Sequence, residues 1–134
     1  MVGLGRMGAN IVRRLAKHGI NSTVFDLSPE AVAALGAEGA ITTSSIADLA
    51  AKLPTPRTVW VMVPHGQPTD DVINELVKHL DKGDLIIEGG NSRFSEDIRH
   101  AAELAEHGIA YLDCGVSGGV WGLENGYGLM VGGD

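Results

Sequence analysis

Hydrophobic and polar positions along the chain alternate between a helical spacing and a strand-like one. In residues 7–18 the apolar side chains Ile11, Val12 and Leu15 fall on one stripe, with basic side chains opposite. This spacing predicts an amphipathic helix that stops at Gly19. Similar spacing, together with capping residues and with glycine or proline stops, predicts four further helices: 28–36, 45–53, 69–80 and 95–107.

Short β-branched and aliphatic runs separate these helices and predict strands. The run 58–63 is apolar on both faces, which is typical of a central parallel strand. Further strands are predicted at 22–26, 84–88 and 109–113. Only Met1 and Val2 precede the first glycine, so the strand expected there is cut short. Regular alternation predicts an α/β fold of the Rossmann type, a doubly wound, mostly parallel sheet with helices on both faces.

Composition narrows the class of protein. A chain of 134 residues is long enough for one core, and 10 basic against 17 acidic residues give a net charge of −7. This charge argues against nucleic acid and anionic membranes as partners. Cys114 is the single cysteine, and the chain has neither an apolar run of about 20 residues nor a leader-like N-terminus. We therefore expect a soluble protein of the reducing cytoplasm.

Glycine is the unusual feature of the composition, with 19 residues, about twice the typical share of ~7%. The first cluster, residues 3–8 (GLGRMG), is a G-x-G-x-x-G motif that directly precedes the first predicted helix. In such a motif Gly3 makes a tight turn, Gly5 lets a pyrophosphate approach the backbone, and Gly8 permits close helix–strand packing. The partial positive charge of the helix N-terminus suits the phosphates.

Asp26 completes this dinucleotide pattern. It lies 18 residues after Gly8, at the end of the second predicted strand, where a carboxylate accepts hydrogen bonds from the adenosine ribose. Its charge would repel a 2′-phosphate, and no arginine lies in 27–30 to receive one. The sequence therefore favours NAD over NADP.

Three other turns follow predicted strands, where ligands bind in open α/β sheets. They are 64–66, 89–92 and 114–119. Two glycines before Asn91 let the backbone approach a ligand while the amide supplies a donor and an acceptor. Ser117 with Gly118 and Gly119 offers a hydroxyl and successive N–H groups, a cradle for an anion or carboxylate.

These motifs together resemble the decarboxylating 6-phosphogluconate dehydrogenases of the β-hydroxyacid dehydrogenase superfamily. The resemblance covers essentially the whole chain and rests on residues 3–10, 88–92, 113–119 and 129–133. Relatives of the hydroxyisobutyrate type usually carry Asp-x-Ser-Thr where this chain has Gly90-Asn91-Ser92, so the phosphogluconate branch fits better. Glu88 in place of the usual Asp, and Pro64-His65 in place of Lys-Ala, both point to the shorter, NAD-preferring members.

The resemblance implies an activity and a set of site residues. The family oxidises the 3-hydroxyl of 6-phosphogluconate by hydride transfer to the nicotinamide, and loss of carbon dioxide then yields ribulose 5-phosphate. The implied cofactor-binding residues are Gly3, Leu4, Gly5, Arg6, Met7, Gly8, Asp26, Val63, Pro64, His65 and Asn91. The implied substrate-binding residues are Asn91, Ser117, Gly118 and Gly119.

The family's general base is a lysine that follows the last strand of this domain, and no matching stretch occurs before Asp134. Residues 1–134 are therefore expected to be an NAD(P)-binding domain truncated at both ends, without its helical C-terminal domain and inactive alone. The full-length form is expected to be a homo-oligomer. A hydroxyisobutyrate-type enzyme, a non-catalytic dinucleotide-binding module and a Rossmann-like methyltransferase remain alternatives.

Other chemically capable side chains have simpler interpretations. Cys114 is expected to be a buried, small apolar residue, and His65 is as consistent with a plain turn residue as with a cofactor contact. Four histidines are placed near helix ends, where they interact favourably with the dipole: His18, His79, His100 and His107. Trp60 is expected in the core and Trp121 against the absent domain. No residue spacing indicates a metal site, and none is expected.

Overall fold

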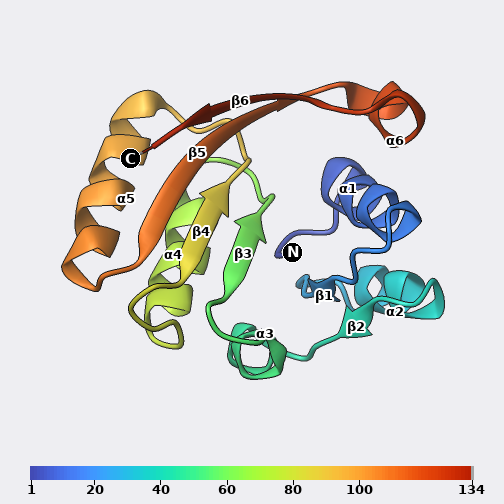
Figure 1. The fold of residues 1–134 in the computed structure, drawn as a ribbon, viewed down its shortest axis with the longest axis horizontal. Helices are drawn as coiled ribbons and strands as arrows, with labels where there is room; N and C mark the ends of the chain where they lie inside the picture. The colour runs from blue at the N-terminus through green and yellow to red at the C-terminus, as the bar shows by residue number, and fades with distance from the viewer. Residues whose placement is uncertain (134) are drawn as a thin grey trace.

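The computed structural model describes residues 1–133. The β-sheet extends to both sides of the N-terminal segment of the chain (Figure 1). Val2 forms isolated parallel bridges with Phe25 on one side and Val61 on the other. It thereby joins the parallel pair β1–β2 to the four-stranded sheet β3–β4–β5–β6. From this central segment the chain first forms β1 and β2 on one side and then crosses to form β3–β6 on the other side. Val2 therefore lies at a topological switch point of the sheet. The strands are β1 (Thr23–Val24), β2 (Ile41–Thr42), β3 (Thr58–Val61), β4 (Leu85–Glu88), β5 (Ala110–Ser117) and β6 (Gly128–Gly132).

Helices cover both faces of the sheet, as predicted. One buried cluster joins α1 (Arg6–Lys17) and α2 (Pro29–Ala37) to the sheet, and the other joins α3 (Ile46–Lys52), α4 (Gln67–Val77) and α5 (Phe94–Glu106) to the opposite face. Side chains alternate between these clusters along β3, where Val59 and Val61 face one core and Trp60 the other. This period of two explains why the predicted strand reads as continuously apolar.

Two of these helices begin at the capping residues that the sequence predicts. The Ser28 hydroxyl accepts a hydrogen bond from the Ala31 N–H (3.3 Å), and that of Ser45 accepts one from the Asp48 N–H (3.0 Å). Helix α4 begins at Gln67, two residues before the predicted start, because Gly66 (φ 87°) makes the turn that precedes it.

The predicted strand 109–113 is too short. β5 continues to Ser117 because β6 pairs with it in antiparallel fashion, from Asp113–Gly132 to Ser117–Gly128. The glycines at this end suggest a loop, but pairing with β6 overrides local propensity. The 3-10 turn η1 (Gly119–Trp121) and the short helix α6 (Gly122–Asn125) connect the two strands. Within residues 1–133, none of the helices has the length and apolar content needed to cross a bilayer.

Candidate functional site

The glycine turn before α1 shows three different glycine environments. Gly3 has φ 93°, and a Cβ there would collide with the Met62 carbonyl oxygen. A Cβ at Gly8 would collide with the Gly3 carbonyl oxygen, so the helix can approach the turn only without a side chain. Gly5 is different, because a Cβ built there meets no atom within 4 Å. The fold needs Gly3 and Gly8, whereas Gly5 leaves open space at the start of the helix.

The N-terminus of α1 is electrostatically suited to an anion. Gly5 is its N-cap, no side chain caps it, and its first turn contains no acidic residue. The first N–H groups of a helix lack intrahelical acceptors and carry a partial positive charge. An anion that enters the space beside Gly5 would therefore meet free donors.

Asp26 links this turn to the start of α2. One carboxylate oxygen accepts the Leu4 N–H (2.7 Å) and the other accepts the Ser28 N–H (2.8 Å). Each oxygen keeps a further lone pair for a ligand hydroxyl. The half-buried Asp26 thus lies at the switch point, hydrogen-bonded to the glycine turn itself.

A cavity of about 480 Å³ brings several predicted residues together at this point. Among its lining residues are Gly3, Asp26, Val63 and Pro64 from the ends of three neighbouring segments. The Thr69 hydroxyl donates to the Pro64 carbonyl (2.9 Å) and holds the turn after β3. His65 lies exposed in the same turn, so the structure leaves its predicted role open.

The cavity also contains residues that sequence reasoning assigned no role. Leu27 is 92% exposed beside it, and Pro68 and Val72 contribute apolar surface from α4. The helical spacing of Val72 indicated only core packing. The leucine directly after Asp26 was the one available sequence signal, since apolar side chains line most small-molecule sites.

The turn after β4 is tied to the end of β5. Asn91 has φ 57°, and its side-chain oxygen accepts the Val116 N–H (3.2 Å). A Cβ at Gly90 would collide with the Val63 carbonyl oxygen, so this turn also lies against the end of β3. Ser117 and the two glycines after it are exposed at the end of β5. The structure therefore gathers the predicted cofactor-side and substrate-side turns at one edge of the sheet.

Cys114 and His100 are both buried in the structure. Cys114 is 2% exposed, and burial raises the pKa of its thiol, as expected for an unreactive core residue. The placement of His100 near a helix end was wrong, because it lies in the middle of α5, 2% exposed, with Nε2 2.7 Å from an Asp70 carboxylate oxygen. The Arg99 guanidinium, with His100 beside it, lowers the pKa of Asp70.

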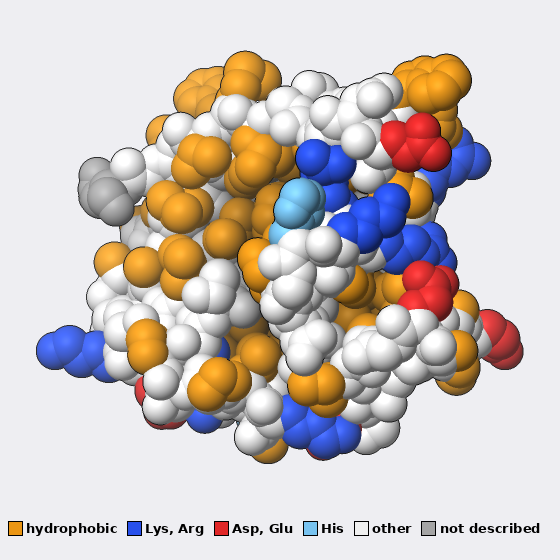
Figure 2. All heavy atoms as spheres, turned by 45° about the vertical axis from the view of Figure 1, so that its right-hand side comes forward, with side chains coloured by type: hydrophobic (Ala, Val, Ile, Leu, Met, Phe, Trp, Pro, Cys, Tyr) orange, Lys and Arg blue, Asp and Glu red, His pale blue; other side chains and the backbone are white. Residues whose placement is uncertain are grey.

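One surface carries many exposed apolar side chains. Figure 2 shows hydrophobic side chains gathered on part of one face, next to a group of basic ones. Large exposed hydrophobic residues on η1 and β6 include Trp121 (70% exposed) and Met130 (76%). Trp60, in contrast, is partly buried and packs against the core, as expected.

The fold and the glycine turn define a Rossmann-type dinucleotide-binding domain. The whole chain, residues 1–134, matches the family model described as the NAD binding domain of 6-phosphogluconate dehydrogenase. The chain belongs to this family.

Its relatives include longer dehydrogenases. A Haloferax volcanii protein named 6-phosphogluconate dehydrogenase, NAD(+)-dependent, decarboxylating, is 46% identical over 133 residues, which are 99% of this chain and 44% of that protein. A Plasmodium falciparum 6-phosphogluconate dehydrogenase structure superposes with a TM-score of 0.92 at 29% identity, over 99% of this chain and 30% of that one. A Mycobacterium tuberculosis 3-hydroxyisobutyrate dehydrogenase gives 0.88 at 28% identity, over 99% and 45%. The chain thus spans less than half of these relatives.

Proposed function

We propose that this chain is the cofactor-binding half, with part of the substrate site, of a decarboxylating 6-phosphogluconate dehydrogenase. The proposed reaction oxidises the 3-hydroxyl of 6-phosphogluconate, releases carbon dioxide and forms ribulose 5-phosphate. The observation that carries the proposal is the open glycine turn, hydrogen-bonded by Asp26, at a sheet edge shared with the Asn91 and Ser117 turns.

The residues fit a nicotinamide dinucleotide. The free N–H groups at the start of α1 would hold the pyrophosphate, and Asp26 would accept hydrogen bonds from the adenosine ribose. Leu27 and Val72 would contact the adenine, while Val63, Pro64 and the neighbouring turn would line the nicotinamide side. When bound, the nicotinamide accepts the hydride.

Substrate would be held by groups that remain free after the fold is formed. The Asn91 oxygen is used by Val116, which leaves its amide NH₂ as a donor to a sugar-acid oxygen. The Ser117 hydroxyl and the exposed N–H groups after it would receive the carboxylate or hydroxyls. By family resemblance the proton is removed by a lysine that follows this domain, and we propose that residues 1–134 belong to a longer, two-part enzyme. A helical second part would cover the apolar surface of η1 and β6.

We propose NAD as the preferred cofactor. Asp26 would lie against a 2′-phosphate, and the like charges would repel each other. Lys52 lines a neighbouring cavity of about 730 Å³. Its ammonium group already interacts with protein oxygens, since Nζ lies 3.1 Å from an Asp48 carboxylate oxygen and 3.0 Å from the Thr42 carbonyl oxygen. This engagement supports discrimination against NADP.

Calorimetric titration with NAD, NADP and S-adenosylmethionine tests the cofactor assignment. We expect the chain to bind NAD more tightly than NADP, and Asp26→Asn to narrow that ratio by about tenfold because it removes the repelling charge. Asp71→Asn is the matched control, because Asp71 lines the same cavity but hydrogen-bonds to Gln67. An unchanged ratio in Asp26→Asn would remove Asp26 from this role. Binding of S-adenosylmethionine alone would favour a methyltransferase instead.

A further inference from the structure

Three carboxylates from separate segments meet on the α5 side of the sheet. Glu88 and Asp113 are directly paired neighbours on β4 and β5, so their side chains leave the same face. Asp97 reaches them from the first turns of α5. One oxygen from each group lies within 4.8 Å of the others. Residue spacing gives no indication of this cluster, because only strand pairing and helix packing bring positions 88, 97 and 113 together.

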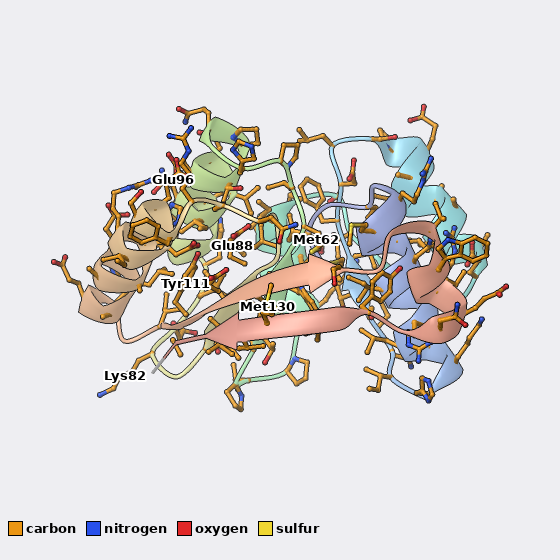
Figure 3. All side chains as sticks on the ribbon, turned by 90° about the horizontal axis from the view of Figure 1, so that it is seen from above. Met62, Lys82, Glu88, Glu96, Tyr111 and Met130 are labelled. Carbon is orange, nitrogen blue, oxygen red and sulfur yellow. The ribbon has the colours of Figure 1, made fainter. Side chains whose placement is uncertain are left out.

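Protein donors hold one oxygen of two of these carboxylates and leave the other oxygen free. The Gly90 N–H donates to Oε1 of Glu88 (2.6 Å), and the Tyr111 hydroxyl donates to Oδ1 of Asp97 (2.7 Å). Glu88 is 0% exposed and Asp97 is 7% exposed, yet Oε2 of Glu88 and Oδ2 of Asp97 have no hydrogen-bond partner among the described residues. The Ser92 hydroxyl, which lies beside Glu88, is also without a partner there. Figure 3 shows Glu88 and Tyr111 close together beside α5.

No basic side chain compensates this charge among the described residues 1–133. The salt bridges there involve none of the three carboxylates. Buried carboxylates without a partner are strongly destabilising when ionised, so the cluster must take up either a cation or protons. In metal sites a protein donor often hydrogen-bonds to a metal-binding carboxylate and so fixes its orientation. The Tyr111 hydroxyl and the Gly90 N–H are placed to do this for Asp97 and Glu88.

The spacing and the donor atoms select the kind of cation. Hard divalent cations take oxygen ligands at about 2.0–2.6 Å, so oxygens on opposite sides of one ion lie about 4–5 Å apart. Three carboxylates within 4.8 Å fit this range, and no sulfur or nitrogen ligand belongs to the cluster. A groove of about 470 Å³ lined by Asp97, Tyr111 and Asp113 provides a route from solvent and room for water ligands.

We propose that Glu88, Asp97 and Asp113 bind one hard divalent cation, of the Mg²⁺, Mn²⁺ or Ca²⁺ class, at a site separate from the dinucleotide cavity. Glu88 also holds the Gly90 N–H, so the cation stabilises the turn that carries Asn91. The site does not depend on the proposed dehydrogenase reaction.

The test is titration of the 134-residue chain with Mn²⁺, followed by calorimetry and by loss of the free-ion electron paramagnetic resonance signal. We expect saturable binding of one ion, competed by Mg²⁺ or Ca²⁺. Asp97→Asn and Asp113→Asn should abolish it, and Tyr111→Phe should weaken it by about 10- to 100-fold because Asp97 loses its orienting donor. Glu96→Gln, which neighbours Asp97 but is outside the cluster, is the matched control and should bind normally.

Circular dichroism on each variant separates loss of the site from loss of the fold. If Asp97→Asn does not fold, Asp113→Asn provides the test of cation binding, because Asp113 is only half-buried. Absence of saturable Mn²⁺ binding to the unmodified chain would overturn the proposal and leave shared protons as the neutralising partner. Unchanged binding in a folded Asp113→Asn would also overturn it.

Discussion

Gly5→Val is expected to leave the fold intact and to weaken dinucleotide binding strongly. Gly5 has φ −62° and ψ −176°, an extended conformation open to valine, and a Cβ there meets no atom within 4 Å. The added side chain would fill the space in which we place the pyrophosphate. Loss of one or two hydrogen bonds to a charged phosphate, about 1.5–3 kcal/mol each, corresponds to about 10- to 100-fold weaker NAD binding or more.

Gly132→Val is the matched control for this change. Gly132 also has open space around its built Cβ, but it lies on β6, away from the glycine turn. Calorimetry with NAD should show normal binding for Gly132→Val, and thermal melts should show the same unfolding temperature for Gly5→Val and the unmodified chain. Equal NAD affinity in both variants would contradict a pyrophosphate at Gly5.

Asp84→Asn is expected to cause a large loss of stability, about 3–5 kcal/mol, because it breaks a buried ion pair. The Asp84 side chain is 2% exposed and accepts hydrogen bonds from the Arg57 N–H (2.6 Å), the Arg57 guanidinium (2.9 Å) and the Asp81 N–H (2.8 Å). Asparagine would replace one accepting oxygen with an NH₂ group that faces these donors. Urea unfolding of the variant and the unmodified chain measures the difference in free energy.

Asp81→Asn provides the comparison on the same arginine. Asp81 lies 2.9 Å from the Arg57 guanidinium but is 75% exposed, so its loss should cost at most about 1 kcal/mol. Burial opposes ionisation of Asp84, but the hydrogen bonds from Asp81 and Arg57 outweigh it and lower its pKa. The stabilisation is therefore complete above the ordinary carboxyl pKa near 4 and disappears as pH falls through the lowered value. A stability difference that stays constant down to pH 2 would contradict this assignment.

Local patterns predict the parts of the fold that local interactions determine. The stripe along α1 and the caps at Ser28 and Ser45 are visible in sequence because each depends on residues within one turn. The end of β5 is not, because pairing with β6 extends it through Cys114 to Ser117. His100 was misplaced for a similar reason, since its partner Asp70 comes from another helix.

The candidate site likewise has one part that the sequence predicts and another that only the packing of the elements produces. The glycine turn and Asp26 follow from a motif with fixed spacing, and the structure adds the hydrogen bond between them. The apolar wall brings Leu27, just after β1, together with Val72 of α4, and the sequence has no local signal for that meeting. The buried carboxylates around Glu88 are likewise a product of topology.

The most direct measurement of the central proposal is an activity assay on a chimera. In it, this chain replaces the matching segment of the Haloferax volcanii relative, to which it is 46% identical. We expect the chimera to form NADH with NAD and 6-phosphogluconate, with release of carbon dioxide, and to form none with 3-hydroxyisobutyrate. A folded chimera that oxidises 3-hydroxyisobutyrate but not 6-phosphogluconate, or that binds NAD and oxidises neither, would contradict the proposed function.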